Sequence, residues 1–166
     1  QDRALAMNGD EAKIEAGECH VFFGCRYLKD RIYAKQIDDW ETQGVLKRHL
    51  ALSRAPDLSK TYVQDLIKAN GQRMCELLMK PNCHYYVCGD ARVANDCFEA
   101  CVQVLRKHGK MSRVGAVQHL KQMKAGNRWQ NDLWGVFTGF DETKPELTLR
   151  KKTAKTWLLS FVQDDE

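Results

Sequence analysis

The sequence has no apolar run approaching the roughly 18 residues that would suggest a membrane span. Its N-terminus also lacks the charged-then-apolar layout of a signal peptide. The net charge of +4 is small beside 26 basic and 22 acidic residues, so the composition indicates no basic field of the kind that drives nucleic-acid binding. These absences favour a soluble, cytoplasmic chain of 166 residues with a single core.

The seven cysteines do not have the spacing of a structural zinc site, because no Cys-x-x-Cys pair is matched by a second pair. Their number is odd, and most lie within apolar segments, where a buried thiol packs like a small apolar group. We therefore expect reduced cysteines and no bound metal.

Four short apolar or β-branched runs alternate with longer segments whose apolar residues have helical spacing. Strands are expected at 19–24, 45–52, 84–88 and 129–133. Helices are expected at 31–43, 63–79, 93–106 and 113–124. This alternation predicts an α/β fold with a doubly wound parallel sheet.

The two ends of the chain fit this pattern less well. Gln1–Met7 is typical of the tail of a helix with no strand before it, so a first strand is expected to be missing. Residues 147–162 mix apolar side chains with the basic cluster Arg150–Lys152, which leaves a strand, a short amphipathic helix and partial disorder open. We predict one lobe over 1–135 and a C-terminal extension over 136–166.

Polar side chains gather after the second predicted strand. Ser53 and Arg54 follow it directly, and ligands of open α/β sheets lie at the carboxyl ends of strands. Lys60, Tyr62 and Gln64 alternate, so they share one exposed face if the residues between them point into the core. Such a set suits a phosphorylated ribose beside a purine. A solvated strand edge with chance spacing is the alternative.

The ends of the third and fourth predicted strands carry a second group. Cys88-Gly89-Asp90 closes a buried strand before a helix, and glycine there permits close approach of the backbone to a flat ring. Asp132 and Trp134 close the last strand. A buried structural thiol and a core tryptophan are the plain alternatives for Cys88 and Trp134.

Taken together, these segments resemble the NADP-binding lobe of the ferredoxin-NADP reductase family, in the diflavin branch of cytochrome P-450 reductase, nitric oxide synthase and sulfite reductase. The resemblance covers nearly all of residues 1–135. Five strings in the family's order carry it: Phe22–Arg26, Leu52–Arg54, Lys60–Gln64, Tyr86–Arg92 and Asn131–Trp134. One such string is weak evidence, whereas five in register are specific.

The resemblance implies roles for these residues. Those matching the positions that hold the 2′-phosphate and adenosine of NADPH are Ser53, Arg54, Lys60 and Tyr62, with Gln64 beside them. Arg26 matches a position near the pyrophosphate, and Gly89 and Asp90 belong to the cofactor-binding strand end.

A catalytic set is implied in the same way. Cys88 and Asp132 match residues beside the nicotinamide and flavin, where a carboxylate offsets charge developing on the nicotinamide. Trp134 matches the aromatic residue that covers the flavin ring.

For the parent protein, the resemblance implies hydride transfer from NADPH to FAD and electron transfer through FMN to a haem or other acceptor protein. FAD and FMN belong to other domains of the parent, and the family's Gly-Thr-Gly loop precedes the position where this chain begins. The fragment alone is therefore expected to carry no flavin and to be inactive. An anchor of the parent on the cytosolic face of the endoplasmic reticulum stays open. The alternative function is a non-catalytic module that binds NADPH or docks a partner.

The residues after Gly135 depart from cytochrome P-450 reductases, which end close to the matching tryptophan. Nitric oxide synthases carry a tail there, although they usually have phenylalanine in place of Trp134. The tail could gate the flavin or pair its basic cluster with an acidic FMN domain. A tail that packs on its own domain or is disordered is the plain alternative.

Overall fold

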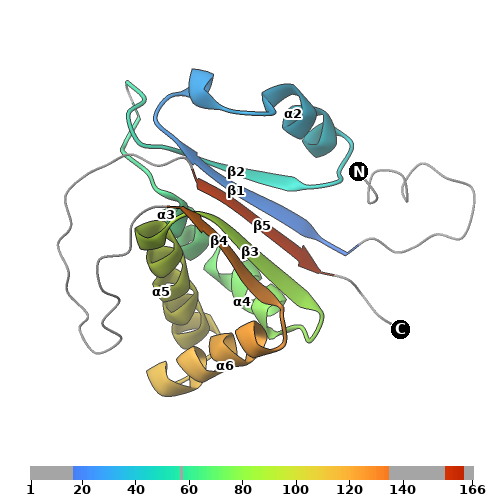
Figure 1. Cartoon of the computed structure of the whole chain (residues 1–166), viewed down its shortest axis with the longest axis vertical. Helices are drawn as coiled ribbons and strands as arrows, with labels where there is room; N and C mark the ends of the chain where they lie inside the picture. The colour runs from blue at the N-terminus through green and yellow to red at the C-terminus, as the bar shows by residue number, and fades with distance from the viewer. Residues whose placement is uncertain (1–16, 57, 135–155, 163–166) are drawn as a thin grey trace, which may run out of the picture.

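The computed structural model describes residues 17–56 and 58–134, and the backbone of 156–162. One five-stranded sheet has the order β2-β1-β5-β3-β4 (Figure 1). The strands are β1 Cys19–Cys25, β2 Lys47–Leu52, β3 Cys83–Asp90, β4 Trp129–Trp134 and β5 Thr156–Val162. The helices are the 3-10 turn η1 Leu28–Asp30, α2 Ala34–Thr42, α3 Val63–Ala69, α4 Gly71–Met79, α5 Ala91–His108 and α6 Arg113–Ala125.

The predicted α/β fold is confirmed. β1 pairs in parallel with β2, and β3 in parallel with β4. Because β5 is antiparallel to both β1 and β3, the four predicted strands all point the same way. The N-terminal segment Gln1–Met7 and the basic cluster Arg150–Lys152 lie outside the described residues. Within the described residues, no helix is both long and apolar enough to cross a membrane.

One predicted helix, 63–79, is in fact two helices that meet at Asn70. The Asn70 side chain donates to the Leu66 carbonyl over 2.8 Å, beside the Asn70 amide, which donates to the same carbonyl over 3.0 Å. A Cβ atom at Gly71 would lie 2.6 Å from Nε2 of His108, at the end of α5. The second helix therefore starts at a residue without a side chain because α5 passes so close.

The centre of the sheet holds a strand that sequence periodicity did not locate. β5 lies between β1 and β3 and is antiparallel to both, with Leu159 opposite Val21 on one side and Tyr86 on the other. Of the alternatives for 147–162, the strand is observed over Thr156–Val162. This segment of the predicted extension joins the two parallel halves of the sheet.

Two layers of helices cover the sheet. Helix α2 lies on one side, where Ile37 packs with Cys19, Val21 and Leu46, while α3 to α6 lie on the other (Figure 1). The larger core forms beneath the second layer and includes Phe22, Tyr85 and Trp129, and the rings of Tyr85 and Trp129 stack 3.9 Å apart. Six of the seven cysteines are buried, as the apolar context of most of them predicts, and Cys88 is half-buried.

A histidine pair lies near the amino ends of β1 and β2. Nδ1 of His20 is 2.9 Å from Nε2 of His49, and its Nε2 is 2.7 Å from a Glu18 carboxylate oxygen. Burial lowers the pKa of His49 to about 4, and the positive charges that His20 and Lys47 carry when protonated add to the effect. Burial also lowers the pKa of His20, although Glu18 opposes that shift. Both rings are therefore neutral in the folded chain at pH 7.

This pair makes folding stability depend on pH. A histidine whose pKa is lowered on folding binds fewer protons when folded, so its contribution is complete above pH 6.5 and is lost as the pH falls towards 4. We expect the free energy of unfolding to fall by about 2 kcal/mol across that window in urea titrations followed by circular dichroism. His49→Asn, which keeps a polar partner for His20, should flatten the curve. An unchanged pH profile in that variant would show that the pair is not responsible.

Candidate functional site

The carboxyl ends of β1 and β2 are tied together by backbone hydrogen bonds. The Ser53 amide donates to the Cys25 carbonyl and the Arg54 amide to the Arg26 carbonyl, each over 3.0 Å. The Ser53 hydroxyl also donates to the Cys25 carbonyl, over 3.3 Å. These contacts hold the exposed residues Arg26 and Arg54 on neighbouring segments at one edge of the sheet.

A further backbone hydrogen bond brings the chain back to this edge. The Thr61 amide donates to the Leu52 carbonyl over 3.1 Å. The Lys60 ammonium lies 5.1 Å from the centre of the Tyr62 ring, within the range of a cation–π contact. Tyr62 is 43% exposed, so one face of its ring is open to a flat ligand. The structure therefore brings Lys60 and Tyr62 together beside Ser53 and Arg54.

The alternation predicted for Lys60, Tyr62 and Gln64 does not extend to Gln64. Helix α3 begins at Val63, so Gln64 lies in its first turn, and its amide donates to the Asp96 carboxylate of α5 over 3.3 Å. Alternation as far as Gln64 requires an extended backbone through that residue, whereas Tyr62 is the last extended residue before the helix. In this structure the Gln64 amide points to α5 rather than to the Lys60 and Tyr62 pair.

The charges at this edge are unbalanced. Arg26, Arg54 and Lys60 form no ion pair with any residue that the structure describes. Other cations near the same two strands are compensated, as where Arg31 and Arg48 both pair with Asp38. Three uncompensated cations beside an open aromatic ring suit an anionic ligand with a flat base.

The ends of β3 and β4 place Cys88 directly opposite Asp132. The Cys88 thiol donates to the Asp132 carboxylate, with sulfur and oxygen 3.7 Å apart. Burial raises the pKa of Cys88, and the charge of Asp132 and the hydrogen bond to it raise the pKa further. Cys88 is thus a protonated thiol at neutral pH, suited to donating a hydrogen bond and not to nucleophilic attack.

The remaining predicted residues take different positions at this strand end. Asp90 caps α5 by accepting from the amides of Arg92 and Val93 over 2.9 and 3.0 Å, so its carboxylate holds the helix start. Gly89 is buried opposite Leu133, and Trp134 is 45% exposed opposite Asp90.

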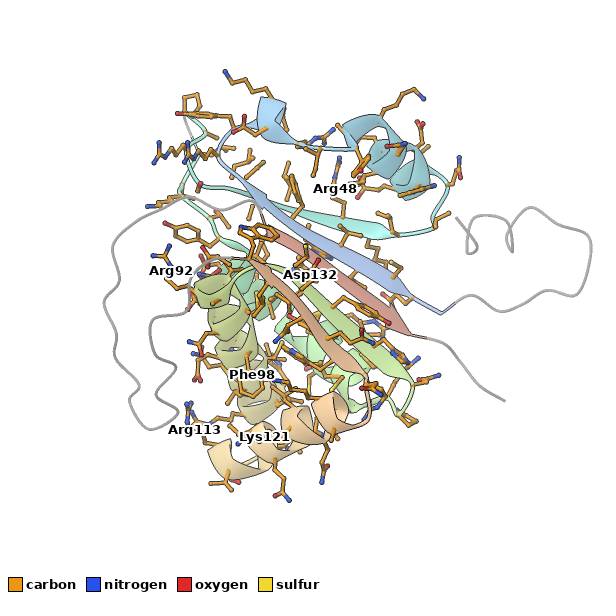
Figure 2. The ribbon with its side chains drawn as sticks, in the orientation of Figure 1. Arg48, Arg92, Phe98, Arg113, Lys121 and Asp132 are labelled. Atoms are coloured by element: carbon orange, nitrogen blue, oxygen red, sulfur yellow. The ribbon has the colours of Figure 1, made fainter. Side chains whose placement is uncertain are left out.

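Sequence reasoning did not assign a role to Arg92, a half-buried cation in the first turn of α5. Figure 2 shows Arg92 and Asp132 near the middle of the molecule, at the level where α5 begins. A basic residue at the start of the helix that follows β3 was the available signal.

The two groups share one edge but occupy different parts of it. The ends of β2 and β3 are separated by β1 and β5, which amounts to three strand spacings, or about 14 Å. An extended ligand with a charged group at one end and a reactive ring at the other can span both. Within the part of the chain that the structure describes, no group of three metal-ligating side chains occurs.

Comparison with known proteins agrees with this arrangement. The model of the oxidoreductase NAD-binding domain family matches residues 3–99. The NADPH–cytochrome P450 reductase of Drosophila melanogaster is 35% identical over 127 residues, covering 75% of this chain and 18% of the relative. A nitric oxide synthase of Lymnaea stagnalis is 36% identical over 128 residues, covering 76% and 11%.

A third relative, the human methionine synthase reductase, is 33% identical over 127 residues, covering 71% of this chain and 18% of the relative. The chain spans less than a fifth of the length of these curated relatives. The family match and these relatives confirm the resemblance that the sequence motifs predict. The chain belongs to the oxidoreductase NAD-binding domain family, in its diflavin reductase branch.

Proposed function

We propose that the carboxyl edge of the sheet binds NADPH. Arg54 and Lys60 hold the 2′-phosphate together with the Ser53 hydroxyl, Tyr62 stacks on the adenine, and Arg26 faces the pyrophosphate. The observation that carries this proposal is the set of cations without ion pairs among the described residues, gathered beside the exposed Tyr62 ring. Gln64 supports the edge from α3 and contributes no direct contact.

In the whole protein, this lobe serves a flavoprotein oxidoreductase. NADPH supplies a hydride to FAD, and electrons pass through FMN to a haem or other acceptor protein; both flavins are held by other domains of the parent. At the other end of the edge, Asp132 presents a carboxylate and Cys88 a protonated thiol to the nicotinamide. The negative charge of Asp132 offsets positive charge on the nicotinamide, and Trp134 has an exposed ring for covering the flavin.

Binding of 2′,5′-ADP tests the nucleotide half of the proposal. We expect this ligand to bind more tightly than 5′-AMP, and Arg54→Ala to weaken it roughly tenfold, because a charge-assisted hydrogen bond is lost. The same substitution should leave the weak binding of 5′-AMP almost unchanged. Isothermal titration calorimetry measures both affinities.

Lys29→Ala provides the matched control. Lys29 is also an exposed cation over a tyrosine ring, 5.7 Å from the centre of Tyr27, but it takes no part in the hydrogen bonds of Ser53 and Arg54 to Cys25 and Arg26. Its removal should not change the ratio of the two affinities. Equal affinity for the two nucleotides in the unmodified chain would contradict the proposal.

A further inference from the structure

One long segment of the chain contains no acidic residue. Residues 100–131 hold no aspartate or glutamate and seven basic residues: Arg106, Lys107, Lys110, Arg113, Lys121, Lys124 and Arg128. The chain has 26 basic and 22 acidic residues, so the rest of it keeps 19 basic against 22 acidic, a net charge of −3. All of the net positive charge therefore lies on this segment.

The fold brings these charges onto neighbouring elements. Six of them lie on the last turn of α5, on the turn that follows it and on α6, which packs against α5, and Arg128 lies between α6 and β4. Arg113 pairs with Glu99, and Arg128 donates to the Cys83 carbonyl. The other five are exposed and form no ion pair with any residue in the described part of the chain. We call these five the α5–α6 basic surface: Arg106, Lys107, Lys110, Lys121 and Lys124.

This surface is separate from the candidate nucleotide edge. Helix α5 begins at Ala91, directly after β3, and runs away from the carboxyl ends of the strands. Figure 2 shows Arg92 and Asp132 near the middle of the molecule and Arg113 and Lys121 towards its lower end. A nucleotide at the carboxyl edge therefore leaves these five cations uncompensated.

The composition of the α5–α6 basic surface limits the kinds of partner that can bind it. Among the described residues between 100 and 131, Val114 is the only large apolar side chain that is exposed, so there is no set of apolar anchors for insertion into a bilayer. A membrane or a nucleic-acid duplex would also extend past the patch and face the net negative remainder of the chain. A compact acidic patch on another protein contacts the cations alone.

We propose that the α5–α6 basic surface docks an acidic surface of another protein or domain. A shallow hollow on the last turns of α5 and the turn after it is lined by Gln103, Arg106, Lys107 and Met111, so two basic side chains border one depression. With few apolar contacts, such a complex depends on charge, associates and dissociates quickly, and weakens as the salt concentration rises. This inference does not rest on the proposed nucleotide function.

The test uses the full chain and a short poly-L-glutamate peptide as the acidic probe, followed by amide chemical shifts in NMR. We expect the shifted amides to cluster between 103 and 124. We also expect R106E/K121E/K124E to weaken binding roughly tenfold or more at low salt. All three positions are exposed, so the spectrum should keep its dispersion. If it does not, the milder K121Q/K124Q variant takes its place.

The control variant K29E/K35E/K68E changes the net charge by the same amount at exposed lysines elsewhere. It should retain binding, because Lys35 and Lys68 already pair with Asp39 and Asp65. Equal loss in both variants would overturn the proposal, as would shifts confined to the surroundings of Arg26, Arg54 and Lys60. Binding of phosphatidylserine vesicles or a DNA duplex in place of the peptide would also overturn it.

Discussion

Leu159→Pro should destabilise the chain by about 3 kcal/mol or more, because proline removes a backbone N–H from the middle of the sheet. Leu159 lies at the midpoint of β5 and is flanked by β1 and β3. A central strand has neighbours on both sides, so a kink there disturbs two ladders at once. A loss of this size is a large part of the 5–15 kcal/mol that usually separates folded and unfolded domains. Thermal and urea unfolding followed by circular dichroism measure it.

Leu159→Ala separates the backbone effect from the side-chain effect at the same position. Alanine shortens the side chain but keeps the N–H, so the ladders on both sides of β5 survive. We expect the alanine variant to remain clearly more stable than the proline variant. If the two variants unfold alike, or if neither differs from the unmodified chain, β5 does not hold the centre of the sheet.

Asp132→Asn in the flavin-containing parent should slow hydride transfer from NADPH about 100-fold or more, a size typical of losing one fixed electrostatic group at a reacting centre. Asparagine keeps the shape and an acceptor oxygen for the Cys88 thiol but removes the charge. Stopped-flow absorbance of the flavin reports the rate. The affinity for 2′,5′-ADP should not change, because Asp132 is on β4, four strand spacings from β2.

The pKa of Cys88 supplies an independent readout of the same substitution. Asp132 raises the pKa of this thiol, so Asp132→Asn should lower it and speed alkylation by iodoacetamide in the chain alone. Cys88→Ser is the matched control, since a hydroxyl still donates to Asp132. A normal hydride-transfer rate in the asparagine variant, with faster alkylation, would show that the carboxylate acts on the thiol only.

Much of the fold follows from local sequence patterns. β3 forms where the apolar run at His84–Cys88 predicts a buried strand, although its burial alternates residue by residue, and α5 and α6 follow their apolar spacing. The split between α3 and α4 could not be predicted in this way. It depends on contact between Gly71 and the end of α5, which is distant in sequence.

The candidate site was predicted unevenly for similar reasons. Lys60 and Tyr62 lie together because the extended backbone assumed for them is present, and Gln64 departs because a helix starts one residue earlier. Asp90 proved to be a helix cap, a role that its position before α5 allowed. The direct opposition of Cys88 and Asp132 depends on the register between β3 and β4, which no local pattern specifies.

The place of β5 has a consequence for how the chain is made. The residues of β1 and β3 leave the ribosome long before Thr156–Val162, yet these two strands are joined only through that later segment. During synthesis each half of the sheet exposes an unpaired inner edge, the kind of surface that invites aggregation. Completion of the sheet therefore waits for Thr156–Val162, and chaperone demand should be greatest just before that segment emerges.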